Sequence, residues 1–280
     1  MTDNAEQIAY WNGRAGQSWA DMQDGMDRSL AAVTRVLLDA AQAGPNERVL
    51  DVGCGCGDTT LQIADAMSAG GTVVGVDVSA PMLELAGRRA AGRTHVELRQ
   101  ADAAQGDLGG PYDLVVSRFG VMFFADPVLA FRNIARAMKP GARLTFVCWQ
   151  DLGKSEWLSL PMQTARPLLT ALPPFPPPDP DAPGPNAFAR RERVQSILQS
   201  AGFARITIEP HDTIITLGEN VHDALTQMLR IGPLARALAD EPPDVRAKVS
   251  AALEAFLSSL AQRGPLALSA SFWLVRAARG

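Results

Sequence analysis

Apolar runs alternate with segments of helical spacing through the middle of the chain. The runs are apolar on both faces, which favours strands buried in a parallel sheet; they lie at 48–52, 72–78, 95–102, 112–117 and 142–149. Between the first two runs, Ile63, Ala66 and Met67 fall on one helical face. Strands that alternate with helices predict an α/β protein, and right-handed crossovers make its sheet doubly wound.

Capping and breaking residues set the ends of the predicted helices. Ser79 is a natural N-cap for the helix after the second strand, and Pro81 is tolerated in its first turn. Asp126-Pro127 begins a further helix that we expect to run to about Met138, where Pro140-Gly141 stops it.

The rest of the chain is less regular. Residues 172–185 are dense in proline, which locks φ and donates no backbone hydrogen bond, so they are neither helix nor central strand. A domain linker and a loop over an active site both remain open. Residues 204–217 and 271–279 resemble strands, and 219–262 are largely helical in pattern. An early helix ending at Gly44-Pro45 has one apolar face, formed by Leu30, Val33, Leu37 and Ala41.

Composition narrows the classes of function. The chain has 280 residues, a net charge of −4 and a pI near 5.4, which gives no basic surface for nucleic acid. Neither a signal peptide nor a membrane-length apolar run is visible, so we expect a cytoplasmic protein without a membrane span. Three cysteines form neither a disulfide framework nor, with three scattered histidines, a recognisable metal site: Cys54, Cys56 and Cys148.

The most informative stretch is VLDVGCGCGDTT, residues 49–60. A strand that runs into glycines and then a helix is the usual geometry for holding a nucleotide. Gly53, Gly55 and Gly57 permit positive φ and leave the backbone open to a ligand. Asp58 stands where the dinucleotide fingerprint has glycine, and its charge disfavours a pyrophosphate at the helix N-terminus. Together with Asp51, it favours a ligand that has a ribose and a cationic centre.

Two further carboxylates follow the next strands. Asp77 ends the second strand, where a carboxylate can accept both ribose hydroxyls. Asp102 ends the third strand, where it can meet the amino group of an adenine. With Asp51, three consecutive strands end in aspartate at one edge of the sheet, which predicts a nucleoside site there.

The ordered motifs resemble those of class I S-adenosylmethionine-dependent methyltransferases. They are VLDVGCGCGDTT, GVDVSAPML, QADA, YDLVVSRFGVMFF and MKPGARLTFVCW, over about residues 45–150. The series is most similar to the group containing the ubiquinone and menaquinone C-methyltransferases (the type 11 group). The resemblance implies S-adenosylmethionine as cofactor and S-adenosylhomocysteine as product.

The resemblance also assigns roles to residues. The glycine turn, with Cys54 lining it, would hold the methionine part of the cofactor. Asp77, with Val78 beside it, would bind ribose. Asp102 and Ala103 would bind adenine, and Met82 would pack on its face. The segment after the fourth strand would border the transfer site: Ser117, Arg118 and Phe119.

The same resemblance predicts a seven-stranded, mostly parallel sheet whose last strand is antiparallel. It divides the chain into a helical leader or lid (1–44), a cofactor-binding core (45–150), a proline-rich insertion (151–190), a core helix and strand (191–218), a helical cap (219–265) and a terminal strand (266–280).

Aromatic residues are concentrated near this predicted site. Trp11 and Trp19 lie in a polar leader, where they can cover the cofactor and stabilise its sulfonium by cation–π contact. Simple packing of the leader on the core is the alternative. Tyr10, Phe119 and Phe123, with Arg118, are candidate substrate-binding residues in an apolar acceptor pocket.

No catalytic base is evident. His211 and His222 can reach a substrate in principle, although solvated surface histidines are the simpler interpretation. The sequence lacks the Asn/Asp-Pro-Pro-Tyr motif of methyltransferases that act on amide or adenine nitrogen, which favours a small-molecule acceptor. A nicotinamide-dependent oxidoreductase and a non-catalytic cofactor-binding protein are the alternatives, and a homodimer is compatible with the sequence.

Overall fold

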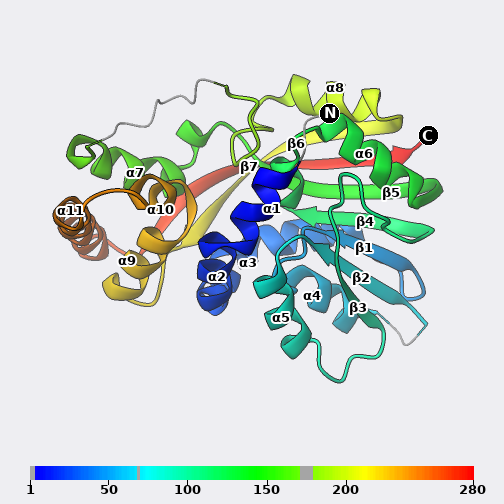
Figure 1. Ribbon diagram of the computed structural model, residues 1–280, viewed down its shortest axis with the longest axis horizontal. Helices are drawn as coiled ribbons and strands as arrows, with labels where there is room; N and C mark the ends of the chain where they lie inside the picture. Colours follow the sequence, from blue (N-terminus) through cyan, green and yellow to red (C-terminus); the bar gives the residue numbers. More distant parts are fainter. Residues whose placement is uncertain (1–3, 68–69, 171–178) are drawn as a thin grey trace.

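The computed structural model describes residues 4–67, 70–170 and 179–280. They form a seven-stranded sheet in the order β3-β2-β1-β4-β5-β7-β6 (Figure 1). The strands are β1 (Arg48–Val52), β2 (Thr72–Asp77), β3 (Val96–Gln100), β4 (Tyr112–Arg118), β5 (Met138–Trp149), β6 (Phe203–Thr216) and β7 (Ala267–Arg279). The first five strands are parallel, and β7 runs antiparallel to both β5 and β6. The predicted doubly wound fold is confirmed, including its antiparallel last strand.

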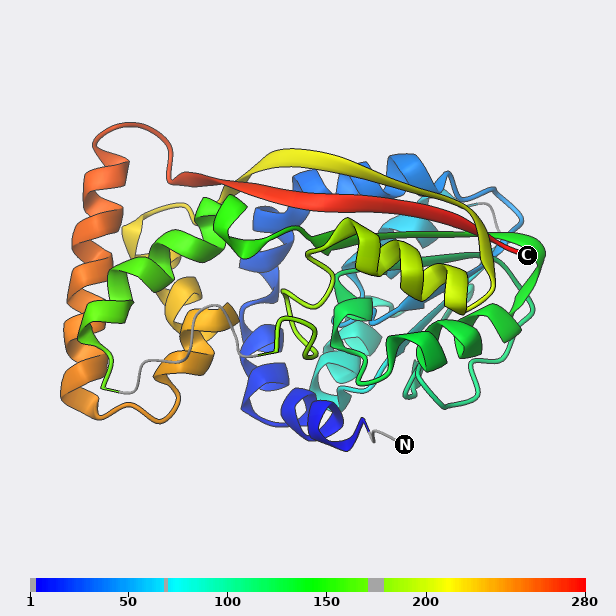
Figure 2. The same cartoon turned by 90° about the horizontal axis from the view of Figure 1, so that it is seen from above.

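Helices cover both faces of this sheet. The helices of the described residues are α1 (Ala5–Asn12), α2 (Arg14–Asp21), α3 (Gln23–Ala41), α4 (Asp58–Ala66), α5 (Ala80–Arg89), α6 (Pro127–Arg136), α7 (Glu156–Ala165), α8 (Arg191–Ser200), α9 (Val221–Arg230), α10 (Gly232–Leu238) and α11 (Pro243–Ala261). Helices α3 and α4 lie on one face, and α6 and α8 on the other (Figure 2). Val49 and Leu114 pack with Ile63 of α4, whereas Leu50 and Val115 join the apolar cluster of Phe131. Burial on both faces explains why the strands are apolar throughout.

A second apolar core lies beyond the parallel strands. Strands β6 and β7 are long and reach the group α7, α9, α10 and α11, which we call the cap (Figures 1 and 2). Leu217 and Leu268, near the cap ends of these strands, pack with Leu234 and Leu253 of the cap helices. None of the helices in the described residues is long and apolar enough to cross a membrane.

Two predicted boundaries are wrong. The helix after Asp126 ends at Arg136, and β5 begins at Met138 and runs through Pro140-Gly141. Lys139 to Gly141 are exposed, so the missing N–H of proline costs little at the open end of the strand.

Ser79 precedes α5 as predicted, but its side chain does not cap that helix. Its hydroxyl donates instead to the Trp11 carbonyl, across 2.7 Å.

Residues 172–178, half of the proline-rich stretch, lie outside the described residues. Its end, from Asp179 onward, is described: the Gly184 N–H donates to the Met122 carbonyl at 3.0 Å. This segment lies against the loop after β4, and a loop over an active site stays a prediction.

Candidate functional site

The glycine turn after β1 folds back onto β2. Gly53, Gly55 and Gly57 have φ angles of 70°, 54° and 86°, values that favour glycine. The N–H groups of Gly53 and Cys54 both donate to the Val76 carbonyl, at 2.8 and 3.1 Å. The turn is thereby fixed before any ligand contact.

Asp77 joins this turn to the end of β2. Its Oδ2 accepts the Gly55 N–H and its Oδ1 accepts the Ser79 N–H, each at 2.8 Å. Burial raises the pKa of Asp77, and hydrogen bonds from the Ser79 and Gly55 backbone partly offset this effect. Each oxygen keeps a lone pair that can accept a further hydrogen bond.

Asp102 follows β3 and is held in a similar way. Its Oδ1 accepts the Ala104 N–H and the Asn4 Nδ2 group, each at 3.0 Å. The Asn4 contact joins residues 98 positions apart. It brings the start of α1 to the end of β3.

The far end of α1 is attached to the β2–α5 loop. Asn12 Nδ2 donates to the Val78 carbonyl at 2.8 Å, and Asn12 Oδ1 accepts the Ala80 N–H at 3.0 Å. Helix α1 therefore crosses the carboxyl ends of two parallel strands, where ligands of open α/β sheets bind.

These elements surround a cavity of about 1600 Å³, larger than the roughly 300–1,000 Å³ of a typical ligand pocket. It extends from the strand ends to the cap helices. Fourteen of the sequence-predicted residues line it: Tyr10, Trp11, Trp19, Gly53, Cys54, Gly55, Asp77, Val78, Met82, Asp102, Ala103, Arg118, Phe119 and Phe123.

Three predicted cofactor-binding residues lie behind the cavity wall instead. Asp51 is buried and its Oδ2 accepts the Thr60 hydroxyl at 2.7 Å; burial raises its pKa to about 6. Ser117 donates to the Val52 carbonyl at 2.7 Å. Gly57 is the residue before α4 and faces Ala86 of α5. Their contacts lie within the protein, and none of them lines the cavity.

The predicted histidines do not reach the cavity either. The His211 ring on β6 stacks on Phe272, with ring centroids 5.6 Å apart. His222 is in the first turn of α9, and it does not line the cavity. Their interpretation as substrate-side bases receives no geometric support.

Aromatic rings form one wall of the cavity. Trp11 makes edge contacts with Tyr10, Trp19 and Phe123, at centroid distances of 5.2, 6.2 and 5.1 Å. Phe119, whose φ of 67° is unusual for a non-glycine residue, stacks on Trp149 at 3.9 Å. The aromatic residues of the N-terminal leader thus pack on the core and line the cavity at the same time. Packing on the core and covering a cofactor are therefore compatible interpretations of these residues.

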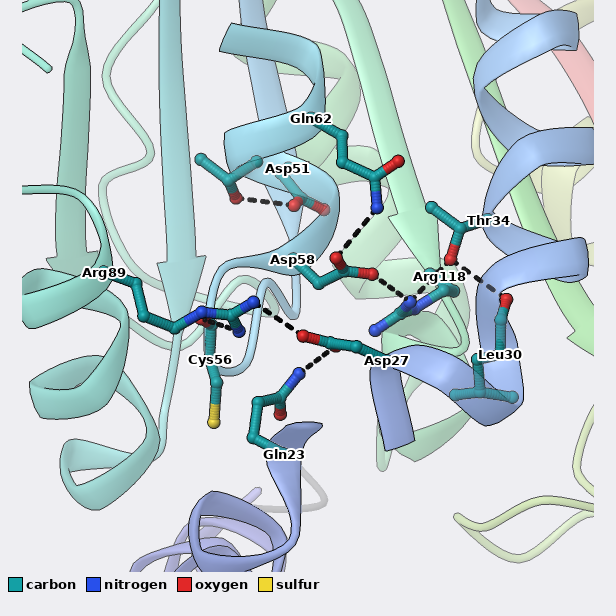
Figure 3. A network of polar contacts seen from close by, with 11 residues as sticks. Gln23, Asp27, Leu30, Thr34, Asp51, Cys56, Asp58, Gln62, Arg89 and Arg118 are labelled. Atoms are coloured by element: carbon teal, nitrogen blue, oxygen red, sulfur yellow. Dashed lines mark hydrogen bonds and ion pairs between the residues drawn. The ribbon is translucent and has the colours of Figure 1, made fainter. Parts of the chain in front are cut away.

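A polar network lies beneath the cavity, between α3, α4 and β4 (Figure 3). Asp58 Oδ2 accepts Arg118 Nη1 at 2.6 Å, and the same nitrogen donates to Thr34 Oγ1 at 2.6 Å. The sequence suggests that Asp58 gives the turn a free negative charge, but this arginine compensates the charge. Arg118 lines the cavity, although part of its hydrogen-bonding capacity is used inside the protein.

The network continues toward the glycine turn. Arg89 Nη2 donates to Asp27 Oδ2 at 2.6 Å, and Arg89 Nη1 donates to the Cys56 carbonyl at 3.0 Å. Gln23 Nε2 donates to the other oxygen of Asp27 (Figure 3). Burial is the main reason why the pKa of Asp27 is raised, and the nearby Asp58 adds to it.

Sequence reasoning missed Asn4, Gln23, Asp27 and Arg89. They have no local motif, because each acts through a partner that is distant along the chain or only becomes adjacent on folding. The two cysteines of the turn are neutral thiols: burial raises the pKa of Cys54 far above its usual value and that of Cys56 to about 12. They fill space and are not reactive thiolates.

Known proteins resemble this chain in sequence and in fold. Residues 49–141 match a methyltransferase domain family. Demethylmenaquinone methyltransferase of Lactiplantibacillus plantarum is 40% identical over 35% of this chain and 44% of that protein. Nocamycin O-methyltransferase of Saccharothrix syringae is 34% identical over 40% of this chain and 41% of that protein. The chain thus spans less than half the length of these two curated relatives.

Solved structures extend the comparison to most of the chain. The YcgJ protein of Bacillus subtilis superposes with a TM-score of 0.55 at 17% identity, covering 89% of this chain and 98% of that one. A phosphoethanolamine N-methyltransferase of Haemonchus contortus, solved with S-adenosylmethionine, gives 0.52 at 19% identity, covering 89% and 52%. The [4+2]-cyclase SpnF gives 0.52 at 18% identity, covering 89% and 80%. The resemblance to class I methyltransferases is confirmed, with the fold as the common property.

Proposed function

We propose that the protein transfers a methyl group from S-adenosylmethionine to a small-molecule acceptor. One observation carries this proposal: Asp77 and Asp102, at the ends of adjacent strands, line the same cavity as the glycine turn. Hydrogen-bond acceptors in this arrangement match a ligand that offers ribose hydroxyls and an adenine amino group. When bound, the cofactor supplies a methyl carbon on a positively charged sulfur, which leaves as a neutral thioether.

The residues of the cavity have distinct tasks in this proposal. Asp77 would accept the ribose hydroxyls, and its backbone hydrogen bonds hold it in place for that contact. Asp102 and Met82 would bind the adenine edge and face. Gly53 and Gly55 would let the methionine part approach the backbone.

The aromatic wall would exclude water and orient the acceptor. Displacement at a methyl carbon requires alignment of the reacting groups, so positioning is the main contribution of the protein. Trp11 of α1 contacts Phe123, which follows β4, so the N-terminal helices pack against that loop. The remaining volume, toward α7 and α10, would hold the acceptor against apolar surface.

The cavity also limits the chemistry of the acceptor. No histidine or lysine is among its lining residues in the part of the chain that the structure describes. Burial raises the pKa values of Tyr10 and Cys54, so neither readily gives an anionic base near neutral pH. Of the lining carboxylates, Asp77 and Asp102 would bind the cofactor, and Asp179 is exposed to solvent. We therefore expect an acceptor that ionises easily or has a free lone pair, such as an acidic enol or phenol. Two relatives are named for O-methylation and for an acid, nocamycin O-methyltransferase and aklanonic acid methyltransferase, which agrees with an acceptor that ionises easily.

The alternatives make different predictions. A nicotinamide-dependent enzyme would need an anion site at the start of α4, where Asp58 lies instead. A cofactor-binding protein without methyl transfer is the other alternative, and it would keep the cofactor site but transfer no methyl group.

A turnover screen tests the proposal. The protein is incubated with methyl-labelled S-adenosylmethionine and a panel of acidic phenols, 1,3-dicarbonyl compounds, thiols and amines. Label should enter an acceptor with release of an equal amount of S-adenosylhomocysteine. Tight cofactor binding with no transfer to any of these classes would favour the non-catalytic alternative.

A further inference from the structure

Two side-chain amides, Asn4 and Gln23, share an unusual arrangement. Each gives its N–H to a carboxylate: Asn4 to Asp102, and Gln23 to Asp27. An ionised carboxylate only accepts hydrogen bonds, so the amide nitrogen and not the oxygen faces it in both cases. The amide oxygens therefore lie on the far side, as Figure 3 shows for Gln23.

Both oxygens are buried and lack a partner. Asn4 is 5% exposed and Gln23 2% exposed. Asn4 Oδ1 and Gln23 Oε1 accept no hydrogen bond within the part of the chain that the structure describes. Because buried polar atoms in folded proteins are almost always paired, two such acceptors need an explanation. Both residues contribute to the lining of the large cavity, so a ligand that binds there with a small shift of these side chains is the natural donor.

The two amides lie at different places along that cavity. Asn4 is bonded to the residue that follows β3. Gln23 is connected through Asp27 and Arg89 to Cys56, in the turn after β1. Strands β1 and β3 are separated by β2, so these ends lie about 10 Å apart at ordinary strand spacing.

The hydrogen-bond donors of the proposed cofactor likewise lie far apart from each other. S-adenosylmethionine has two groups with N–H bonds, the adenine amino group and the ammonium of its methionine part, at opposite ends. We propose that Asn4 Oδ1 accepts from the adenine amino group and Gln23 Oε1 from the ammonium. Residues from the start of the chain would thus recognise both ends of the cofactor. This inference rests on the proposed function.

Three probes separate the two contacts by equilibrium binding. S-adenosylhomocysteine has both donors, S-inosylhomocysteine has an oxygen in place of the adenine amino group, and 5′-methylthioadenosine lacks the methionine ammonium and carboxylate. The variants are Asn4→Ala and Gln23→Met. Gln17→Met is the matched control, because Gln17 donates to Asp21 at 2.8 Å on the exposed side of α2.

Each variant should lose its preference for S-adenosylhomocysteine over one of the other two probes and keep its preference over the second. Asn4→Ala should lower the preference for S-adenosylhomocysteine over S-inosylhomocysteine by about fivefold, as for a neutral hydrogen bond. Gln23→Met should lower the preference over 5′-methylthioadenosine by about tenfold or more, since its partner is charged. Gln17→Met should change neither ratio.

The outcomes distinguish this inference from the proposed function. If the unaltered protein binds S-adenosylhomocysteine but neither ratio changes in its variant, the inference is wrong and the proposed function stands. Equal losses for all three probes would show a general effect on the fold, and would also overturn the inference. If the unaltered protein does not bind S-adenosylhomocysteine, both proposals are wrong.

Discussion

Arg118 and Asp58 form an almost buried ion pair, 2.6 Å apart, with side chains 10% and 9% exposed. It joins the end of β4 to the first residue of α4. The carboxylate of Asp58 therefore occupies the N-terminus of the helix that begins at the glycine turn, where nucleotide phosphates bind in related sheets. This contact explains in structural terms why the turn departs from the dinucleotide fingerprint.

Removing one partner of this pair should be strongly destabilising. We expect Asp58→Ala to lower the free energy of unfolding by about 3–5 kcal/mol, because it leaves the Arg118 charge buried without its carboxylate. Urea denaturation measures the change. Asp65→Ala is the control, since Asp65 pairs with Arg93 on the surface and should contribute far less. Similar losses in both variants would contradict the account.

Asp51 should make stability depend on pH. Burial raises its pKa from 3.8 to about 6, so the folded state holds this proton more tightly than the unfolded state. The resulting stabilisation is complete below about pH 4 and is lost as the pH rises through about 6. Asp51→Asn, which carries no charge, should therefore be more stable than the unaltered protein at pH 8, by on the order of 1–3 kcal/mol.

The comparison at two pH values isolates this effect. The advantage of Asp51→Asn should disappear at pH 4, where the native aspartate is protonated. Denaturation curves at both values measure it, and titrating groups that do not interact with Asp51 cancel in the difference. An advantage of equal size at pH 4 and pH 8 would show that the charge of Asp51 is not its cause.

Close packing of the N-terminal helices should be necessary for ligand binding. A Cβ at Gly16 would lie 2.0 Å from the Trp11 carbonyl oxygen and 2.6 Å from Ser79 Oγ. Gly16→Ala should therefore displace α1 and α2 and weaken S-adenosylhomocysteine binding, by on the order of tenfold. Gly87→Ala on α5 is the control, because its Cβ would meet no atom within 4 Å. Equal affinities of the two variants would contradict a role for this packing.

The two histidines should be dispensable for methyl transfer. His211 and His222 lie outside the cavity, so His211→Ala and His222→Ala should keep kcat within about twofold, well below the 10²-fold or larger effect of a general base. Steady-state rates with an acceptor from the turnover screen measure this. A loss of 10²-fold or more in either variant, with the fold intact, would place that histidine in the reaction.

The sheet and its acidic strand ends could be predicted because their signals are local. The apolar runs predict β1, β2 and β3, the glycines after Val52 mark the end of β1, and the parallel arrangement then brings Asp77 and Asp102 to one edge. The topology of the sheet alone places these two carboxylates, so this prediction needs no knowledge of side-chain contacts.

Other features depend on contacts that no local pattern encodes. The bond from Asn4 to Asp102 spans 98 residues, and the pair of Arg118 and Asp58 spans 60. The sequence likewise does not show that Asp51 and Ser117 face the protein interior. Successive side chains of a strand point to opposite sides, so a shift of one position decides whether a side chain lines the cavity or lies behind it. The extension of β5 through Pro140 is possible only because that end is exposed.

Binding calorimetry with S-adenosylhomocysteine tests the central claim most directly. We expect the protein to bind S-adenosylhomocysteine and not NAD, and Asp77→Ala to weaken binding by about tenfold or more through loss of the charge-assisted ribose contact. Asp65→Ala, on the exposed surface, should bind like the unaltered protein. Binding of NAD without binding of S-adenosylhomocysteine, or unchanged affinity in Asp77→Ala, would contradict the account.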